Sequence, residues 1–409
     1  MTKASELDRV LSLVVMDEGN GSVWDADNHY YEAIDAFTRH LAPSDGPRCV
    51  QWATIEGRQY HVVGGRVSRA VANATFDPIA KPGCLSEYFR GNPNNVNPLD
   101  LLKDHEPIRP EYRGPAARVK VLDEQRLEGC FLFPTLGMIY EELLKQDPPA
   151  VCKTFTAFNR WLREDWTFDY QGRIISAPYL SLADLDWAVR ELEWALNEGA
   201  RLIVMRPAAP TLATGRLNPF DRYFDPFWAR INEAGVGVII HAGDSGASSD
   251  GYADDSFSAS FKGQGFGPSV KGFAIEKAAH DYLLSMVLAN MFQRFPNLRV
   301  ASVENGAEFI PDLFRKLRSQ AKKTPGWFTD DPVETFRRHI WINPFWEDDL
   351  DSVVSWMGAD RVIFGSDWPH IEALPQPLDY LVETKNLPVR DQRLILHDNA
   401  VELAVRRPS

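Results

Sequence analysis

The chain has 409 residues, of which 44% are hydrophobic and 25% are charged, so it has globular composition and enough length for a large core. Its net charge of -13 argues against a general nucleic-acid or anionic-membrane binder, because such a partner would meet a repulsive field. Four cysteines without a CxxC motif, and no apolar run long enough for a transmembrane helix, point to a cytoplasmic protein.

Eight short apolar stretches recur along the chain, and most are followed by a turn and a helical pattern. Continuous apolar runs of this kind are typical of parallel strands covered on both faces. Strands that alternate with helices in this number predict an α/β protein with a (β/α)8 TIM barrel fold. A doubly wound open sheet is the alternative, but no glycine-rich phosphate loop follows the first strand. The stretches span residues 22–29, 127–135, 172–180, 200–208, 235–243, 298–306, 339–347 and 361–369.

The segments between these stretches include four with apolar residues at helical spacing. The first, residues 181–200, is expected to begin with Ser181 as its N-cap, because Asp184 follows three residues later. It is expected to end near Gly199. The other three helices are predicted over residues 219–235, 274–296 and 348–359.

The first and second strands are separated by about ninety residues, which is too long for a bare loop. Within this connection, residues 49–67 alternate like a β-hairpin that turns at Glu56-Gly57. We therefore expect an insert subdomain that adds no strand to the barrel and lies near its mouth or at the interface of a homo-oligomer, a dimer. The predicted divisions are a lead-in over 1–21, a barrel over 22–32 and 127–400, and the insert over 33–126.

A second long connection follows the fifth strand. Residues 244–273 are rich in serine, glycine and aspartate, which predicts a loop. Beside a barrel mouth such a loop is either a lid or a plain surface loop, and the sequence favours neither.

Polar side chains stand where several of the apolar runs end. Active sites of (β/α)8 barrels lie at the carboxyl ends of the strands, so these side chains are expected to converge at one mouth. Imidazoles and carboxylates from four strand ends suit a divalent transition metal such as Zn²⁺, with one position open for water. The first strand ends with Asp25, Asp27 and His29 on one face, the fifth with His241, the sixth with Glu304 and Asn305, and the eighth with Asp367.

Other residues near the predicted mouth are candidates to contact a small-molecule substrate. Arg206 ends the fourth strand, and it is either a clamp for a substrate carboxylate or the partner of a structural acid. His370 lies just past the end of the eighth strand and is a candidate to face the pocket. We predict substrate contacts from Arg206, His370, Asn305 and Trp368.

Four motifs carry a resemblance to a known family. They are DADNH at 25–29, VIIHAG at 238–243, FPNLRVASVENGAEFIPD at 295–312 and VIFGSDWPH at 362–370. In this order and spacing, the chain resembles the amidohydrolase superfamily. The resemblance is to the amidohydrolase-related (type 2) branch, which includes aminocarboxymuconate-semialdehyde decarboxylase and related aromatic-acid decarboxylases. It covers the first strand and residues 127–400.

The resemblance implies one divalent metal, usually zinc and sometimes manganese. Carried over by position, the ligands are Asp27, His29, His241 and Asp367. Asp25 matches a family aspartate two residues before the ligand pair, and we expect it to bond to the backbone rather than to the metal. Two positions depart from the family pattern. Asp27 replaces the first histidine of an HxH pair, and Glu304 replaces a histidine that is catalytic in many members.

Three functions are compatible with these residues. The first is hydrolysis of a small carbonyl- or carboxylate-bearing substrate by a metal-activated water, with Asp367 as the base and Glu304 as its rival. The second is non-oxidative decarboxylation of an aromatic or enoic acid, in which Asp367 protonates carbon. The third is a non-catalytic barrel with a degenerate site. We expect hydrolysis, with Asp367, Glu304 and His241 as the catalytic group.

Overall fold

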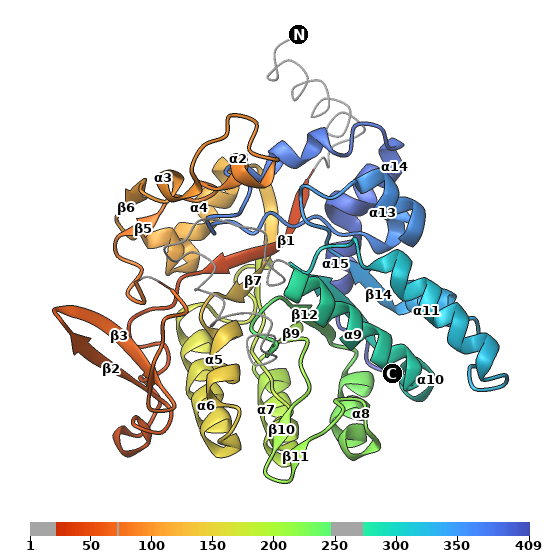
Figure 1. Cartoon of the computed structure of the whole chain (residues 1–409), viewed down its shortest axis with the longest axis horizontal. Coiled ribbons are helices and arrows are strands. Elements are labelled where there is room, and N and C mark those ends of the chain that lie inside the picture. Colours follow the sequence, from red (N-terminus) through yellow and green to blue (C-terminus); the bar gives the residue numbers. More distant parts are fainter. Residues whose placement is uncertain (1–21, 72, 247–272) are drawn as a thin grey trace.

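The computed structural model describes residues 22–71, 73–246 and 273–409, and within them parallel strands form a barrel surrounded by helices (Figure 1). Two runs of hydrogen-bonded strands make up most of the barrel. The first run, in spatial order, is β1 (Val23–Tyr30), β7 (Leu127–Pro134) and β8 (Ile174–Ser176). The second run is β14 (Ile340–Ile342), β13 (Arg299–Val303), β12 (Gly237–His241) and β9 (Leu202–Met205).

The two runs close on each other at both ends. A parallel bridge between Tyr179 and Val204 joins the end of β8 to β9. On the other side, the eighth predicted stretch lies between β14 and β1. The backbone amide of Ile363 donates to the carbonyl of Ile342 at 2.9 Å, and the amide of Ala26 donates to the carbonyl of Phe364 at 2.8 Å. The eighth stretch therefore closes the barrel, although its pairing is too irregular for a continuous strand.

Helices form the outer layer, and they pack their apolar residues against the strands (Figure 1). Most have aspartate as the N-cap or proline in the first turn, and both residues are favoured where helices begin. The longer helices are α4 (Pro115–Glu124), α5 (Gly137–Leu144), α6 (Pro148–Asp165), α7 (Leu185–Asn197), α8 (Asp225–Ala234), α9 (Ala274–Leu288), α11 (Ile310–Lys323), α12 (Pro332–His339) and α13 (Leu350–Met357). Short helices α10 (Met291–Arg294), α14 (Val389–Arg393) and α15 (Asn399–Ala404) complete the layer.

Two of the predicted helices differ in detail. Helix α7 begins three residues later than expected, because Asp184 is its N-cap and accepts a bond from the amide of Trp187 at 2.7 Å. The hydroxyl of Ser181 instead donates to the carboxylate of Glu141 at 2.7 Å. The helix predicted over 274–296 is divided into α9 and α10, because Asn290 takes a left-handed backbone conformation with φ of 54°.

The strands of the predicted insert form separate sheets. Strands β2 (Val50–Ile55), β3 (Arg58–Val63) and β4 (Arg66–Val67) make one antiparallel sheet, and β5 (Ile79–Ala80) pairs with β6 (His105–Glu106) in another. The hairpin turns at Glu56-Gly57 as predicted, with positive φ at both residues. It projects to the side of α5 and α6 in Figure 1. Helix α4 packs against β7, so the end of this segment also serves the barrel.

Two further predictions were a long loop after the fifth strand and the absence of a transmembrane helix. The predicted loop over 244–273 falls almost wholly on residues 247–272, which lie outside the described residues. Within 22–71, 73–246 and 273–409, no helix is both long enough and apolar enough to span a bilayer.

Candidate metal centre

Four side chains from three strand ends converge at the mouth of the barrel. The Nε2 atom of His29 lies 3.3 Å from Oδ1 of Asp27 and 3.4 Å from Oδ1 of Asp367. The Nε2 atom of His241 lies 3.4 Å from the same Asp27 oxygen. All four side chains are buried. The carboxyl ends of β1, β12 and the eighth stretch therefore bring two imidazoles and two carboxylates together at the barrel mouth, with His29 in contact with both carboxylates.

Each of these four side chains has a buried atom without a hydrogen-bond partner. These atoms are Oδ1 of Asp27, Nε2 of His29, Nε2 of His241 and Oδ2 of Asp367. Unpartnered buried polar atoms are costly, so a cluster of four calls for a ligand that satisfies them together. A divalent cation does this, because each of the four atoms carries a lone pair.

The two imidazoles are held in the orientation that a metal requires. The Nδ1 atom of His29 bonds to the backbone carbonyl of Pro134 at 3.2 Å, and Nδ1 of His241 bonds to the carbonyl of Ala242 at 2.9 Å. A carbonyl oxygen only accepts, so Nδ1 carries the proton and Nε2 keeps its lone pair for the cluster. Burial, followed by the charge of His370, keeps the pKa of His29 well below its usual value, so this ring is neutral.

Asp25 holds the strands that carry the ligands. Its Oδ1 accepts the amides of Asp27 and Ser366 at 3.1 and 2.9 Å, and its Oδ2 accepts the hydroxyl of Ser366 at 2.6 Å and the side-chain amide of Asn28 at 2.9 Å. The carboxylate thus joins β1 to the eighth stretch, and it points away from the cluster. This placement agrees with the predicted backbone-bonding role. Burial raises the pKa of Asp25 to about 7.

Glu304 is a fifth side chain, and the third carboxylate, at the edge of the cluster. Its Oε2 lies 3.4 Å from Nε2 of His241 and 3.7 Å from Nε2 of His29. The residue has a positive φ of 57°, and its amide donates to Oδ1 of Asn343 at 3.2 Å, which turns the side chain over the end of β13. Burial raises the pKa of Glu304 well above its usual value, and the charges of Asp367 and Asp27 add to this effect.

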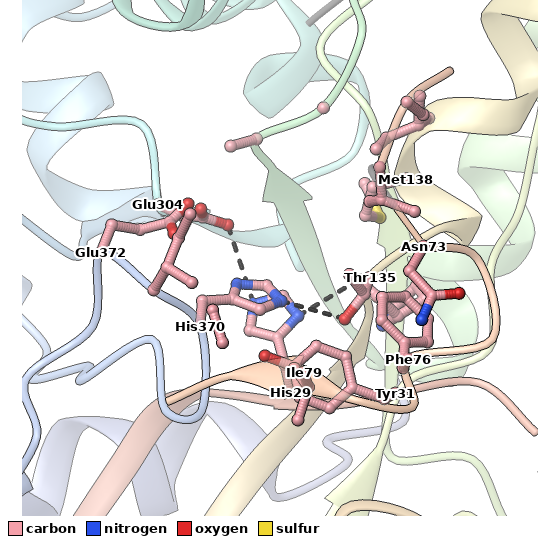
Figure 2. A pocket seen from close by; sticks show the side chains of 18 of the residues that line it. His29, Tyr31, Asn73, Phe76, Ile79, Thr135, Met138, Glu304, His370 and Glu372 are labelled. Atoms are coloured by element: carbon pink, nitrogen blue, oxygen red, sulfur yellow. Dashed lines mark hydrogen bonds and ion pairs between the residues drawn. The ribbon is translucent and has the colours of Figure 1, made fainter. Parts of the chain in front are cut away.

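His370 extends the cluster on the other side. Its Nδ1 lies 2.6 Å from Oδ1 of Asp367, and its Nε2 lies 2.9 Å from the hydroxyl of Thr135. The ring stacks on His29 with centroids 3.9 Å apart, and Figure 2 shows the two rings in the middle of the pocket. Thr135 donates its own proton to the carbonyl of Tyr30, so its oxygen accepts from His370. Nε2 of His370 therefore carries a proton.

A cavity of about 340 Å³ opens from this cluster, within the range of small-molecule sites. In Figure 2, Glu304 and Glu372 lie on one side of it, and Asn73 and Phe76 lie on the opposite side. The barrel supplies the polar side, and the insert supplies much of the apolar wall. The insert residues that line the cavity include Arg69, Val71, Phe76, Ile79, Leu102 and His105.

Comparison with known proteins identifies the family. A family model described as amidohydrolase matches residues 102–403. The chain belongs to the amidohydrolase family. An amidohydrolase of known structure from Mycobacterium avium subsp. paratuberculosis K-10 is 41% identical, with a TM-score of 0.87 over 94% of this chain and 99% of that one. No curated protein sequence matches this chain. The predicted family and the TIM barrel fold are thus confirmed, and the chain is an enzyme of the amidohydrolase family.

More distant structures share the fold. The 2,6-dihydroxybenzoate decarboxylase from Rhizobium is 19% identical, with a TM-score of 0.54 over 70% of this chain and 87% of that one. A dihydroxybenzoic acid decarboxylase from Polaromonas sp. JS666, with bound manganese and the inhibitor 2-nitroresorcinol, is also 19% identical, with a TM-score of 0.55 over 78% and 93%. At this identity the likeness establishes the fold alone.

Arg206 lies outside the cavity of this amidohydrolase. Its Nη1 donates to Glu142 at 2.7 Å and to the carbonyl of Asp244 at 2.5 Å, and its Nε lies 3.4 Å from Glu141. Side chain and partners are buried together, so the guanidinium is already neutralised. The structure therefore agrees with the alternative of a structural ion pair and does not support the predicted clamp on a substrate carboxylate.

Asn305 and Trp368 also lie outside the cavity, which does not support their predicted contacts with substrate. The side-chain amide of Asn305 donates to the carbonyls of Ile240 and Val303, both at 2.9 Å, so it fixes the ends of β12 and β13. The ring of Trp368 is buried against Tyr112, 5.4 Å between centroids, and under the guanidinium of Arg118. Both side chains point into the barrel wall rather than towards a ligand.

The residues missed by sequence reasoning come mainly from the insert. Arg69, Phe76 and His105 line the cavity, yet nothing in their local sequence distinguishes them from surface loop residues. Glu372, two residues past His370, also lines the cavity. The only signal in the sequence for Glu372 is that it follows the eighth stretch closely, which puts it near the barrel mouth.

Proposed function

We propose that this chain is a metal-dependent hydrolase that attacks a carbonyl group of a small organic substrate with an activated water. The observation that carries this proposal is the set of four buried atoms without partners on Asp27, His29, His241 and Asp367. Nε2 of His29 lies 3.3 Å from Oδ1 of Asp27 and 3.4 Å from Oδ1 of Asp367, and Nε2 of His241 lies 3.4 Å from the same Asp27 oxygen. The same four residues are the ligands that the family resemblance implies.

The donor set fits a divalent ion. Two imidazole nitrogens and two carboxylate oxygens suit Zn²⁺, which we propose as the native metal. Manganese is the second candidate, because the additional carboxylate of Glu304 lies close enough to join an oxygen-rich shell. The manganese in the Polaromonas decarboxylase is compatible with either assignment for this chain.

The protein's own groups provide the proton transfers of hydrolysis. A bound divalent ion supplies Lewis acidity, which polarises a carbonyl and lowers the pKa of water. Asp367 accepts the proton of the attacking water and returns it to the leaving group. His370 holds Oδ1 of Asp367 at 2.6 Å, and Oδ2 of Asp367 is buried without a partner, which leaves it free to accept a proton.

The ionisation of Asp367 depends on the cation. Burial raises the pKa of Asp367 well above its usual value, and the charges of Glu372 and Asp27 raise it further. A nearby divalent charge acts in the opposite direction and favours the carboxylate. Asp367 is therefore a base only in the metal-loaded protein.

The charges around the cluster favour hydrolysis over decarboxylation. Asp27, Glu304, Asp367 and Glu372 place four acidic groups at this end of the cavity. Among the described residues that line the cavity, Arg69 is the only arginine or lysine, and it belongs to the insert. A substrate carboxylate at the metal would add another negative charge to this end, whereas a neutral carbonyl would not.

Non-oxidative decarboxylation of an aromatic or enoic acid is the second candidate. It is favoured by Glu304, a further carboxyl group beside the cluster that is placed to deliver a proton to carbon. In that reaction a carbon–carbon bond breaks, CO₂ leaves, and the carbon takes up this proton.

The test is a screen of esters, amides, lactones and carboxylic acids with the zinc- and manganese-loaded protein in H₂¹⁸O and D₂O. Hydrolysis places one ¹⁸O in the acid product. Decarboxylation releases CO₂ and places one deuterium on carbon. The hydrolase proposal fails if the loaded protein turns over only carboxylic acids with release of CO₂.

A further inference from the structure

The cavity has a cationic side chain at its insert wall. Arg69 follows β4, lines the cavity and is exposed. Within the part of the chain that the structure describes, no acidic group pairs with it. Other exposed arginines of the chain do pair with acids, as Arg48 does with Asp147. Arg69 thus brings to the cavity lining a guanidinium that no acid among the described residues pairs with.

Most of the other residues that the insert and α5 contribute to the cavity are apolar. Val71, Phe76, Ile79 and Leu102 come from the insert, and Met138 and Ile139 come from α5. Asn73 also lines the wall, but its side chain already bonds to Thr75 and to the carbonyl of Asp77. A ligand that fills this cavity therefore needs an apolar body, with polar groups only at its ends.

The charged residues that line the cavity favour one partner for an anionic group of a ligand. Acidic groups surround the metal centre, and Glu372 adds a carboxylate to the cavity wall beside it. An anionic group of a ligand is repelled from these carboxylates and attracted to the guanidinium of Arg69. An arginine also binds a carboxylate, sulfonate or phosphate through two parallel hydrogen bonds.

We propose that Arg69 is a specificity-determining residue that binds an anionic group of the substrate at the insert wall of the cavity. The substrate is then an amphipathic acid with an apolar body, whose charged end stays unchanged while its other end is directed to the metal centre. The claim that the uncharged end reacts at the metal centre rests on the proposed hydrolase function. The claim that Arg69 binds the anionic group does not rest on it.

Two fluorescent probes test the binding step with the metal-loaded protein. They are 1-anilinonaphthalene-8-sulfonate and N-phenyl-1-naphthylamine, which share an apolar body and differ in the sulfonate. Arg69→Ala should weaken binding of the sulfonate probe by at least ~10-fold, equivalent to about 1.4 kcal/mol, and leave the neutral probe unchanged. Arg69→Lys should restore part of the affinity, because it keeps the charge but not the fork.

The matched control is Arg58→Ala. Arg58 is an exposed arginine of β3 in the same hairpin, and it does not line the cavity, so this variant should bind both probes like the parent chain. Equal affinities of the parent and Arg69→Ala for the sulfonate probe overturn the inference, as does an equal loss for both probes. Probe binding needs no turnover, so its result does not depend on the isotope test of hydrolysis. Either the anion-binding role of Arg69 or the hydrolase function can fail while the other stands.

Discussion

Asp25 gives the most detailed prediction, because one buried carboxylate holds together the two strands that carry three of the proposed ligands. It accepts four hydrogen bonds, two of them from the backbone amides of Asp27 and Ser366. Replacement by alanine leaves both amides buried without an acceptor. Each such group costs about 1–3 kcal/mol, so Asp25→Ala should lower the free energy of unfolding by about 2–6 kcal/mol.

Asparagine separates the hydrogen bonds from the charge. Asp25→Asn keeps one oxygen for the two backbone amides, and its amino group can donate to the hydroxyl of Ser366. It loses the bond from Asn28, so its cost should be about 1 kcal/mol. Charge adds little to the difference, because burial holds the pKa of Asp25 near 7 and the group is partly protonated at neutral pH.

Urea unfolding in the presence of a chelator measures these effects without a contribution from metal binding. Asp186→Ala is the control, since Asp186 is an exposed acid in the first turn of α7 and should cost less than about 1 kcal/mol. After reloading, Asp25→Ala should also bind metal about 10–100-fold more weakly. The reasoning is refuted if Asp25→Ala is as stable as the control, or if Asp25→Asn is as damaging as Asp25→Ala.

Three further predictions concern catalysis, pH and the buried ion pair. With equal metal content, Asp367→Asn should keep its substrate affinity and lose at least ~10²-fold in turnover. If this variant turns over normally and Glu304→Gln is inactive, then Glu304 is the base. Burial raises the pKa of Glu32 from 4.5 to about 7, so the folded protein holds a proton that the unfolded chain releases, and stability falls as pH rises through this window. Glu32→Gln should remove up to about 3 kcal/mol of that fall between pH 4.5 and 7 in thermal unfolding, and an unchanged pH profile would exclude this role. Arg206→Met leaves Glu141 buried without its cation and should cost about 3–5 kcal/mol in urea unfolding, while a loss below 1 kcal/mol would show that the pair is not structural.

The barrel and the polar residues at its mouth could be predicted because both depend on local patterns. A strand buried on both faces is a continuous apolar run, and the first polar residues after it stand at the mouth by geometry. Asp27, His29, His241 and Asp367 all follow this rule, but the family resemblance, and not the pattern, selected these four as ligands. The turn at Glu56-Gly57 was predictable for the same reason, since a tight hairpin requires residues that tolerate positive φ.

The features that could not be predicted depend on contacts between distant segments. Ser181 has the right spacing for an N-cap, but a bond to Glu141, forty residues away, takes its hydroxyl. The role of Arg206 was open because its partners lie on α5 and after β12. The place of Arg69 in the cavity depends on how the insert packs against the barrel, which the local sequence does not indicate. Local sequence carries no signal for such pairings.

The central claim is that a divalent ion is held by Asp27, His29, His241 and Asp367. The most direct test is metal analysis by mass spectrometry after the purified protein is stripped, reloaded with Zn²⁺ or Mn²⁺ and dialysed. The account predicts about one ion per chain for the parent and for Asp186→Ala, and almost none for His29→Ala. It is contradicted if the parent retains no metal, if His29→Ala retains a full complement, or if Asp25→Asn loses the metal while Asp27→Asn keeps it.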